Sequence, residues 1–401
     1  MSKVSKLLDS ARTFLFAALL ALQSFATWPS EHFKQEKLAE IETEMNRAIE
    51  EHRLPGGVIW IESQGAVYHK AFGHRAIVPQ AEPMTEDTIF DVASMTKVLA
   101  TVPALMLLRE RGKLNIDELA RTYLPEFTGG GKEAITLRHL LTHTSGFDRA
   151  LSQFPDWAHF PKAFQAICAQ QLARPPGTLH VYSDINFIIL GELFQRVSGE
   201  RLDKFVAREI YRPLKMGDTS FLPTADKLPR IAPTEKIGSE VLRGKVHDPK
   251  GRAMGGVAGH AGVFTTAADL ARFARMMLNQ GELDGVRIFQ PATIKLMTSV
   301  QTGDQVEARR GLGWDIDSDF SRPRGNIFPI GSYGHSGFTG CSLWIDPFSR
   351  TFVMLLSNRV HPDSSANIYA LQRDLGTLAA EAVEDFNFST VPGALAPRRK
   401  P

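Results

Sequence analysis

The sequence has little cysteine and almost no net charge. Its 401 residues include two cysteines, Cys168 and Cys341, so no network of disulfides can hold the fold together. The sequence leaves open whether these two pair, since pairing requires their Cα atoms to lie close together. We favour two buried free thiols. The 46 basic and 44 acidic residues leave a net charge of +2, which gives no electrostatic reason to expect a nucleic-acid partner.

Apolar runs long enough to span a membrane are absent beyond the N-terminus. The first residues are basic, Phe14 to Leu22 form a short apolar run, and small residues precede a cleavage site after Ala26. This order is typical of a secretory signal peptide, so we predict that residues 1–26 are removed on export. The alternative is an uncleaved anchor, although the run is short for a bilayer span. We expect a periplasmic or secreted protein with no stable membrane span after cleavage.

Motifs that bind nucleotides or metals are also missing. The glycine-dense segment 255–262 lacks the Lys-Ser/Thr ending of a phosphate loop and the spacing of a dinucleotide fingerprint. We predict instead that these glycines allow tight backbone packing near a site. His139 and His143 are spaced like a helical metal pair, but Leu140 stands where the His-Glu-x-x-His motif has glutamate. No metal and no cofactor is expected.

Strand and helix patterns at the two ends of the chain favour one shared sheet. Near the N-terminus, the pattern predicts an amphipathic helix at 31–53 and a strand hairpin at 58–62 and 66–72. Near the C-terminus, it predicts strands joined by a turn at 342–357 and a closing helix at 367–383. We therefore predict an α/β (α+β) fold, in which an antiparallel sheet flanked by helices is built from both ends of the chain.

The middle of the chain is expected to form a mostly helical lobe, inserted into this fold at about 113–245. Within it, the stretch 113–174 looks mostly helical. A single domain would cover 27–390. The tail 391–401, which ends in basic residues, is expected to be disordered.

Ser94-Met95-Thr96-Lys97 opens a long apolar stretch. We predict a helix from Ser94 to about Arg111, which Pro103 kinks or locally breaks. A serine hydroxyl needs a base beside it to act as a nucleophile near neutral pH, and residues i and i+3 share one face of a helix. Ser94 would also lie near free backbone N–H groups and the positive end of the helix dipole. The motif is common by chance, and an N-capping serine followed by a surface lysine is the alternative.

Two further motifs follow in order, Tyr182-Ser183-Asp184 and His335-Ser336-Gly337. Together with Ser94-x-x-Lys97 and the supporting stretch 140–146, they resemble the serine β-lactamase and penicillin-binding-protein family, in its class C-like branch of esterases and D-amino-peptidases. The resemblance covers residues from about 40 to 385. It implies a β-lactamase/transpeptidase-like fold and an exported serine hydrolase that works through an acyl-enzyme.

The first two motifs carry the reacting groups in this family. By the resemblance, Ser94 matches the acylated nucleophile, and Lys97 matches the base or proton relay that activates it. Tyr182 matches the tyrosine that works with this lysine as general base and later as acid to the leaving group.

The third motif lines one side of the substrate site. His335 and Gly337 match the first and third positions of the family's Lys-Thr-Gly strand. The resemblance implies an oxyanion hole made of the backbone N–H groups of Ser94 and Phe338; such donors commonly contribute about 3–4 kcal/mol to a transition state. Ser336 is disfavoured as a second nucleophile, because adjacent side chains on a strand face opposite ways.

Two residues depart from the family pattern. Asp184 stands in place of asparagine, and its charge would favour a protonated Lys97. Alternatively, Asp184 only orients Lys97, which leaves Tyr182 as the base. His335 stands in place of lysine and would give a cation that titrates near neutral pH, where the family keeps a lasting cation for the substrate carboxylate. Both changes put β-lactam hydrolysis in doubt more than acyl transfer itself.

The expected substrates are small molecules: esters, D-amino-acid peptides, or β-lactams that are hydrolysed slowly or not at all. A non-catalytic, penicillin-binding-like sensor or scaffold is the alternative from another class. The complete set of Ser94, Lys97 and Tyr182 favours the enzyme, because a scaffold has no need of it. Trp314 and Phe338 either line an acyl pocket or pack in the core or at the surface.

Overall fold

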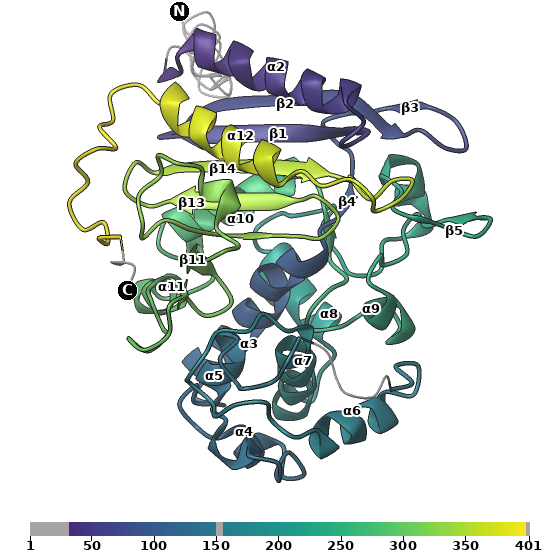
Figure 1. Ribbon diagram of the computed structural model, residues 1–401, viewed down its shortest axis with the longest axis vertical. Helices are drawn as coiled ribbons and strands as arrows, with labels where there is room; N and C mark the ends of the chain where they lie inside the picture. Colours follow the sequence, from purple (N-terminus) through teal and green to yellow (C-terminus); the bar gives the residue numbers. More distant parts are fainter. Residues whose placement is uncertain (1–31, 150–154, 398–401) are drawn as a thin grey trace, which may run out of the picture.

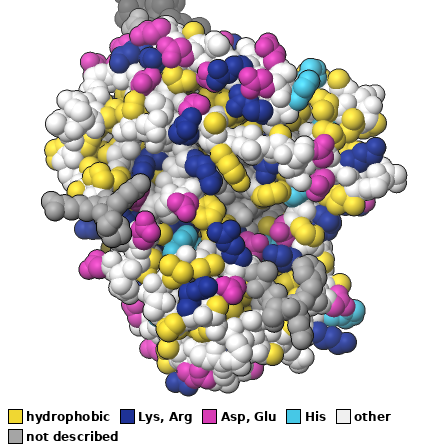
Figure 2. All heavy atoms as spheres, viewed as in Figure 1, with side chains coloured by type: hydrophobic (Ala, Val, Ile, Leu, Met, Phe, Trp, Pro, Cys, Tyr) yellow, Lys and Arg dark blue, Asp and Glu magenta, His cyan; other side chains and the backbone are white. Residues whose placement is uncertain are grey.

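The computed structural model describes residues 32–149 and 155–397. The predicted signal peptide, 1–26, lies outside the described residues, as does the basic end of the tail. Within the described ranges, no helix has the length and apolarity needed to cross a membrane. On the face drawn in Figure 2, basic and acidic side chains are interspersed, as the near-zero net charge predicts.

An antiparallel sheet of eight strands forms the upper part of the molecule in Figure 1. In spatial order the strands are β10 (Arg309–Arg310), β11 (Asp315–Asp317), β12 (Tyr333–Ser336), β13 (Ser342–Asp346), β14 (Thr351–Ser357), β1 (Gly56–Ser63), β2 (Ala66–Ala76) and β3 (Glu82–Pro83). Strands β1 and β14 pair at the centre, where Val58 lies opposite Leu356 and both are buried. The predicted sheet built from both ends of the chain is confirmed.

Two helices from opposite ends of the chain lie side by side over one face of this sheet: α2 (Gln35–Glu50) and α12 (Tyr369–Ala382) (Figure 1). In α2, Leu38, Ile41 and Met45 recur at helical spacing, and all three are buried. The other face packs against α10 (Ala267–Leu278) and the main hydrophobic core. Both predicted terminal helices are confirmed.

The lower part of the molecule in Figure 1 is built from helices and loops. The prediction that 113–174 is mostly helical is wrong, because only short helices occur among its described residues. Gly129, Gly130 and Gly131 adopt φ angles of 75°, 63° and 90°, which a continuing right-handed helix cannot use. The helices here are α3 (Val102–Glu110), α4 (Ala120–Tyr123), α5 (Leu137–Leu141), α6 (Phe160–Ala169), α7 (Asp184–Ser198), α8 (Leu202–Val206), α9 (Pro249–Ala253) and α11 (Pro291–Thr298).

The helix predicted from Ser94 is made of three different turns. It begins as a 3₁₀ turn at Ala93–Met95, widens into a π-helical turn at Lys97–Thr101 and continues as α3. Pro103 lies in the first turn of α3, directly after the π turn, and has no N–H to offer the carbonyl of Leu99 four residues earlier; that carbonyl accepts from the Tyr211 hydroxyl at 3.1 Å. The predicted broken turn is therefore present, just before the proline. Such π turns are frequent at functional sites.

The C-terminal tail is more ordered than predicted. The backbone N–H of Leu395 donates to the carbonyl of Ile330 at 2.8 Å, and the side chain of Arg309 donates to the carbonyl of Ala396 at 2.7 Å. These bonds hold the tail against the β10 end of the sheet. The prediction of disorder is therefore wrong for residues 391–397.

The two cysteines do not pair. Cys168 lies half-buried in α6, whereas Cys341 is fully buried next to β13, and both are free thiols. Burial raises the pKa of Cys341 to about 12, so this thiol stays protonated at neutral pH. The prediction of two buried free thiols holds for Cys341 and is wrong for Cys168, which is partly exposed.

Candidate active site

A cavity of about 390 Å³ collects the predicted site residues. Lys97 lies behind its wall, with no exposed surface, in contact with Ser94. The three motifs, far apart in the sequence, thus meet at one place. The predicted residues that line the cavity are Ser94, Tyr182, Asp184, His335, Gly337 and Phe338.

A buried carboxylate supports the turn that carries Ser94. Ala93 adopts a φ of 46°, which is uncommon for a residue with a side chain. Its N–H donates to Asp91 at 2.8 Å, and the second oxygen of Asp91 accepts from the His247 N–H at 2.7 Å. Burial raises the pKa of Asp91. The sequence analysis missed this residue, because a single aspartate before the motif gives no signal of its own.

The end of β12 lies directly against the same turn. A Cβ added to Gly337 would lie 2.3 Å from the carbonyl oxygen of Val92, so only glycine allows this approach. Thr339 then donates to the carbonyl of Asp91 at 2.7 Å, which ties the two segments together. Phe338, between these two residues, lines the same cavity as Ser94, and the oxyanion hole stays a prediction.

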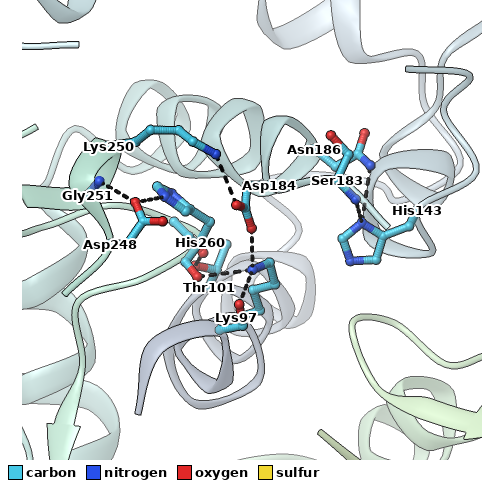
Figure 3. Close-up of polar contacts among 12 residues, drawn as sticks. Lys97, Thr101, His143, Ser183, Asp184, Asn186, Asp248, Lys250, Gly251 and His260 are labelled. Carbon is cyan, nitrogen blue, oxygen red and sulfur yellow. Dashed lines mark hydrogen bonds and ion pairs between the residues drawn. The ribbon is translucent and has the colours of Figure 1, made fainter. Parts of the chain in front are cut away.

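The Lys97 ammonium is fully paired (Figure 3). Its Nζ donates to Ser94 Oγ at 3.1 Å, to Asp184 Oδ1 at 3.0 Å and to the carbonyl of His260 at 3.1 Å. An ammonium has three N–H donors and no acceptor, so this set uses all of its capacity. Burial alone would lower the pKa of Lys97, but the interactions of the lysine with Tyr182 and Asp184 outweigh burial and raise the pKa. The structure therefore favours a protonated Lys97.

Asp184 is shared between two lysines. Its second oxygen accepts from Lys250 Nζ at 3.1 Å, as Figure 3 shows. Burial opposes its charge, but Lys97, His260 and Lys250 together hold the pKa of this carboxyl well below its usual range. Lys250 was missed by the sequence analysis, because it lies in a Pro- and Lys-rich segment with no periodic pattern.

The glycine-dense segment 255–262 packs behind Lys97, as predicted. A Cβ added to Gly259 would lie 2.1 Å from the carbonyl oxygen of Phe187. The carbonyl of Gly259 accepts from Thr101 Oγ1 at 2.6 Å, and the next carbonyl in the chain is the one that binds Lys97. The absence of a side chain therefore places a backbone acceptor at the lysine.

Tyr182 is held between aromatic rings. Its ring centre lies 4.4 Å from that of His143, and Lys97 Nζ lies 5.1 Å from the tyrosine ring centre. His143 Nδ1 accepts from the N–H of Ser183 at 3.3 Å, and its other close partner is the amide of Asn186 at 3.2 Å. His143 is thus a support for the tyrosine motif.

His139 serves another purpose, so the pair of histidines does not converge on one site. Its Nδ1 accepts from the backbone N–H of Thr136 at 3.2 Å, while Thr136 Oγ1 accepts from the N–H of His139 at 3.3 Å. These two bonds form a capping box that begins α5.

The expectation that His335 titrates near neutral pH is wrong. Its side chain is 4% exposed, and its Nδ1–H donates to the carbonyl of Ser336 at 2.8 Å. Burial, followed by the positive charge of Arg310, lowers the pKa of His335 well below its ordinary value. Arg310 itself forms a buried ion pair with Asp315 at 3.2 Å. His335 is therefore a neutral imidazole in the cavity wall at neutral pH and in mild acid.

Phe338 and Trp314 have different surroundings. Phe338 is 54% exposed and lines the cavity, which fits a substrate-contacting position. Trp314 is fully buried in the main core and is not among the lining residues. Of the two alternatives left open by the sequence, Phe338 lines the cavity, whereas Trp314 packs in the core.

Asp184, Asp248 and His260 offer ligand atoms within 4.8 Å of one another, as a metal site would. However, both oxygens of Asp184 already bind ammonium groups, and His260 Nε2 lies 2.8 Å from Asp248 Oδ1. A metal cation placed here would be repelled by the ammonium groups of Lys97 and Lys250. The cluster is therefore better suited to balancing the charges of these two lysines. Burial opposes ionisation of Asp248, but the bond to His260 lowers its pKa to about 2.

The fold and the converging motifs define a serine hydrolase. The β-lactamase family model matches residues 38–377, which is most of the chain. The chain therefore belongs to the β-lactamase family, as the sequence motifs indicated.

Named relatives support this placement. The Escherichia coli (strain K12) protein "Putative D-alanyl-D-alanine carboxypeptidase" is 31% identical, over 89% of this chain and 94% of that protein. The "N-acetylmuramyl-L-alanine amidase" of Bacillus subtilis (strain 168) is 30% identical with the same two coverages. The solved structure of "EstCE1, a hydrolase with promiscuous acyltransferase activity" has a TM-score of 0.68 at 23% identity, over 87% of this chain and 99% of that one. This last similarity supports the fold alone.

Proposed function

We propose that this protein is an exported hydrolase that forms an acyl-enzyme on Ser94, with D-amino-acid amides and simple esters as substrates. The observation that carries the proposal is the fully buried Lys97 ammonium, 3.1 Å from Ser94 Oγ in the wall of the cavity. Burying an ammonium costs several kcal/mol, of the order of 3–5, unless it is well paired. A surface lysine one turn after a capping serine would have no such environment.

In this mechanism Tyr182 enters the step as a phenolate: Ser94 Oγ attacks the acyl carbon while its proton passes to the phenolate oxygen of Tyr182. Lys97 is a poor acceptor for that proton, because its three N–H groups are directed at Ser94, Asp184 and a carbonyl. Lys97 acts by its charge, which stabilises negative charge on Tyr182. Tyr182 returns the proton to the leaving nitrogen or oxygen as its bond to the acyl carbon breaks.

The developing oxyanion would be bound by the backbone N–H groups of Ser94 and Phe338. Removing one such donor typically costs about 100- to 1,000-fold in kcat. Water then adds to the acyl carbon and gives its proton to Tyr182. Ser94 Oγ leaves with that proton, which restores the free enzyme and releases a carboxylic acid.

The proposed substrates follow from the relatives and from His335. The names of the two relatives, a D-alanyl-D-alanine carboxypeptidase and an N-acetylmuramyl-L-alanine amidase, favour amide bonds at alanine residues, and the first of them favours D-alanine. At the third-motif position, where the family holds the substrate carboxylate, a neutral His335 offers no lasting positive charge to a β-lactam. We therefore propose that β-lactams are poor substrates compared with esters.

Export is proposed from the N-terminal sequence alone. The basic start, the short apolar run and the small residues before Ala26 support cleavage there and a periplasmic or secreted enzyme. N-terminal sequencing of protein from the envelope fraction tests this. A chain that still begins at Met1 would contradict it.

The acyl-enzyme is tested by incubating residues 27–401 with p-nitrophenyl acetate, nitrocefin and a D-Ala-D-Ala peptide, with intact-mass detection of adducts. Ser94→Ala should lower kcat by at least about 10⁴-fold and abolish the adduct, since loss of a nucleophile removes the covalent route. Ser336→Ala should still form the adduct. An adduct that survives loss of Ser94 would overturn the assignment, and an adduct without turnover would favour the sensor.

A further inference from the structure

Asp91 is a buried carboxylate that the proposed mechanism does not use. It lies in β4 (Phe90–Asp91), three residues before Ser94, and only 2% of the residue is exposed. It is not among the residues that line the cavity, so it does not contact a substrate bound there. Burying a carboxylate is costly unless it is hydrogen-bonded, so the groups that its oxygens bind indicate its role.

One side-chain oxygen of Asp91 fixes the backbone next to Ser94. Oδ1 accepts from the N–H of Ala93 at 2.8 Å, and Ala93 has a φ of 46°. A residue with a side chain keeps such a φ only where the surrounding structure imposes it. Without this bond, Ala93 would be free to relax to a negative φ, and the peptide group that carries the Ser94 N–H would rotate.

The backbone carbonyl of Asp91 holds the other half of the proposed oxyanion hole. It accepts from Oγ1 of Thr339, the residue directly after Phe338, at 2.7 Å. On the other side of Phe338, Gly337 lies so close to Val92 that an added Cβ would be 2.3 Å from its carbonyl oxygen. In the part of the chain that the structure describes, the N–H of Phe338 has no hydrogen-bond acceptor of its own. This N–H is therefore held from both sides and left unused.

The second side-chain oxygen of Asp91 connects these two segments to the cavity wall. Oδ2 accepts from the N–H of His247 at 2.7 Å. The imidazole of His247 stacks on the ring of Phe338, with 5.7 Å between the ring centres, and both residues line the cavity. Asp91 thus acts on Phe338 by two routes, through its own carbonyl and through His247.

We propose that Asp91 is a positioning residue that sets the spacing between the backbone N–H groups of Ser94 and Phe338. It can do so because it joins the turn of the nucleophile, the end of β12 and the wall at His247. The proposal rests on the proposed hydrolase function and extends it to a residue outside the cavity. A displacement of about 1 Å at a reacting group can lower a rate by about 100-fold.

The test is Asp91→Asn, which keeps the size and shape of the side chain. An amide has one acceptor oxygen and one NH₂ group, so it can accept from Ala93 or from His247 but not from both. We expect kcat for p-nitrophenyl acetate to fall about 30- to 100-fold. KM should stay within about threefold of the wild-type value, because Asp91 does not contact the substrate. Circular dichroism and urea melts establish that the variant is folded under the assay conditions.

Asp346→Asn is the matched control. Asp346 is also a buried carboxylate, and it accepts from the backbone N–H and the hydroxyl of Ser349, away from the cavity lining. The substitution should lower the urea midpoint, as in Asp91→Asn, and leave kcat within about twofold of wild type, because distant sites do not couple to the reaction.

Thr339→Val tests the same connection without changing the carboxylate, and it decides the question if Asp91→Asn does not fold. Loss of its hydroxyl leaves the Asp91 carbonyl without this donor, so kcat should fall about three- to tenfold. Its control is Thr351→Val, where a buried hydroxyl donates to Ser63 Oγ at 2.8 Å, away from the cavity lining. That variant should keep kcat within about twofold of wild type.

Wild-type kcat in folded Asp91→Asn, or in Thr339→Val if the former does not fold, would overturn the positioning role. Equal losses of kcat in a variant and its control would do the same, as would a rise in KM without a fall in kcat. The acyl adduct of the wild-type protein separates the two proposals. Its absence contradicts the hydrolase and the positioning role together, whereas an adduct with unchanged kcat in the variants contradicts the positioning role alone.

Discussion

Lys97 and Arg359 are two cations of one cavity that are held in opposite ways. Lys97 has no exposed surface and gives its three N–H groups to a hydroxyl, a carboxylate and a carbonyl. Arg359 is nearly as buried, and within 32–149 and 155–397 its guanidinium contacts the carbonyl of Ala366 and the ring of Phe338. A cation whose bonds are complete can act on its neighbours only through its charge and its fixed position. A cation with N–H groups to spare can still bind a ligand.

The largest effect is expected when Lys97 itself is replaced. Lys97→Met should lower kcat for p-nitrophenyl acetate by about 1,000-fold or more, because the nucleophile and the tyrosine both lose the ammonium. It should also cost about 3–5 kcal/mol of unfolding free energy, since Asp184 loses a buried partner. Stopped-flow kinetics and urea denaturation measure the two effects.

Lys132→Met is the matched control for this substitution. Lys132 is also buried, but it donates to the carbonyl of Gln170, away from the cavity lining. It should affect stability and leave kcat within about twofold of wild type, since distant sites do not couple to the reaction. Equal loss of kcat in both variants would mean that the Lys97 effect is structural.

Asp184→Asn makes Lys97 resemble Arg359, because the lysine keeps an acceptor but loses its counter-charge. The pKa of Lys97 is raised by Asp184 and Tyr182 against burial, so removing the carboxylate should lower it. In the pH profile of kcat/KM, the alkaline limb should shift to lower pH by at least about one unit, equivalent to about 1.4 kcal/mol. Unfolding free energy should fall by about 2–3 kcal/mol. An unmoved alkaline limb would show that the charge of Lys97 does not control the rate.

His335 gives the comparison an uncharged side chain in the wall of the same cavity. Because its folded pKa lies well below the ordinary 6.5, its contribution to stability is complete above pH 6.5 and is lost as the pH falls. In acid the His335 imidazole binds a proton in the unfolded chain but not in the folded chain. His335→Gln should therefore reduce the slope of unfolding free energy against pH by about 0.7 kcal/mol per pH unit at pH 6.5, rising to about 1.3 kcal/mol per pH unit near pH 5. An unchanged slope, read from urea melts, would mean that His335 does titrate in the fold.

The smallest effect is expected at Lys250, the outer partner of Asp184. Lys250→Met removes one of two ammonium groups from the carboxylate, at a position that is 24% exposed. Partial exposure weakens such a pair, so kcat should fall only a few-fold, by about 1 kcal/mol or less. A loss as large as that of Lys97→Met would show that Lys250 takes part in the reaction more directly.

The sequence predicted the elements whose patterns are local. The terminal helices and the central strands have clear apolar periods, and their predicted positions agree closely with α2, β1, β2, β13, β14 and α12. The helical prediction for 113–174 failed because glycines with positive φ break that stretch into short turns. The prediction of a disordered tail was wrong for residues 391–397, because hydrogen bonds to distant residues hold this segment in place.

The sequence by itself predicted which side chains do the chemistry, a serine, a lysine and a tyrosine, and the glycine of the third motif, from the spacings that the family motifs require. It also revealed the two departures, Asp184 and His335. Only the tertiary structure decided their charge states, because a pKa depends on burial and on the charges brought near by the fold. It paired Asp184 with Lys97 and Lys250, and it made His335 neutral. Among the described residues it also left Arg359 without an acidic partner, which no spacing along the chain can show.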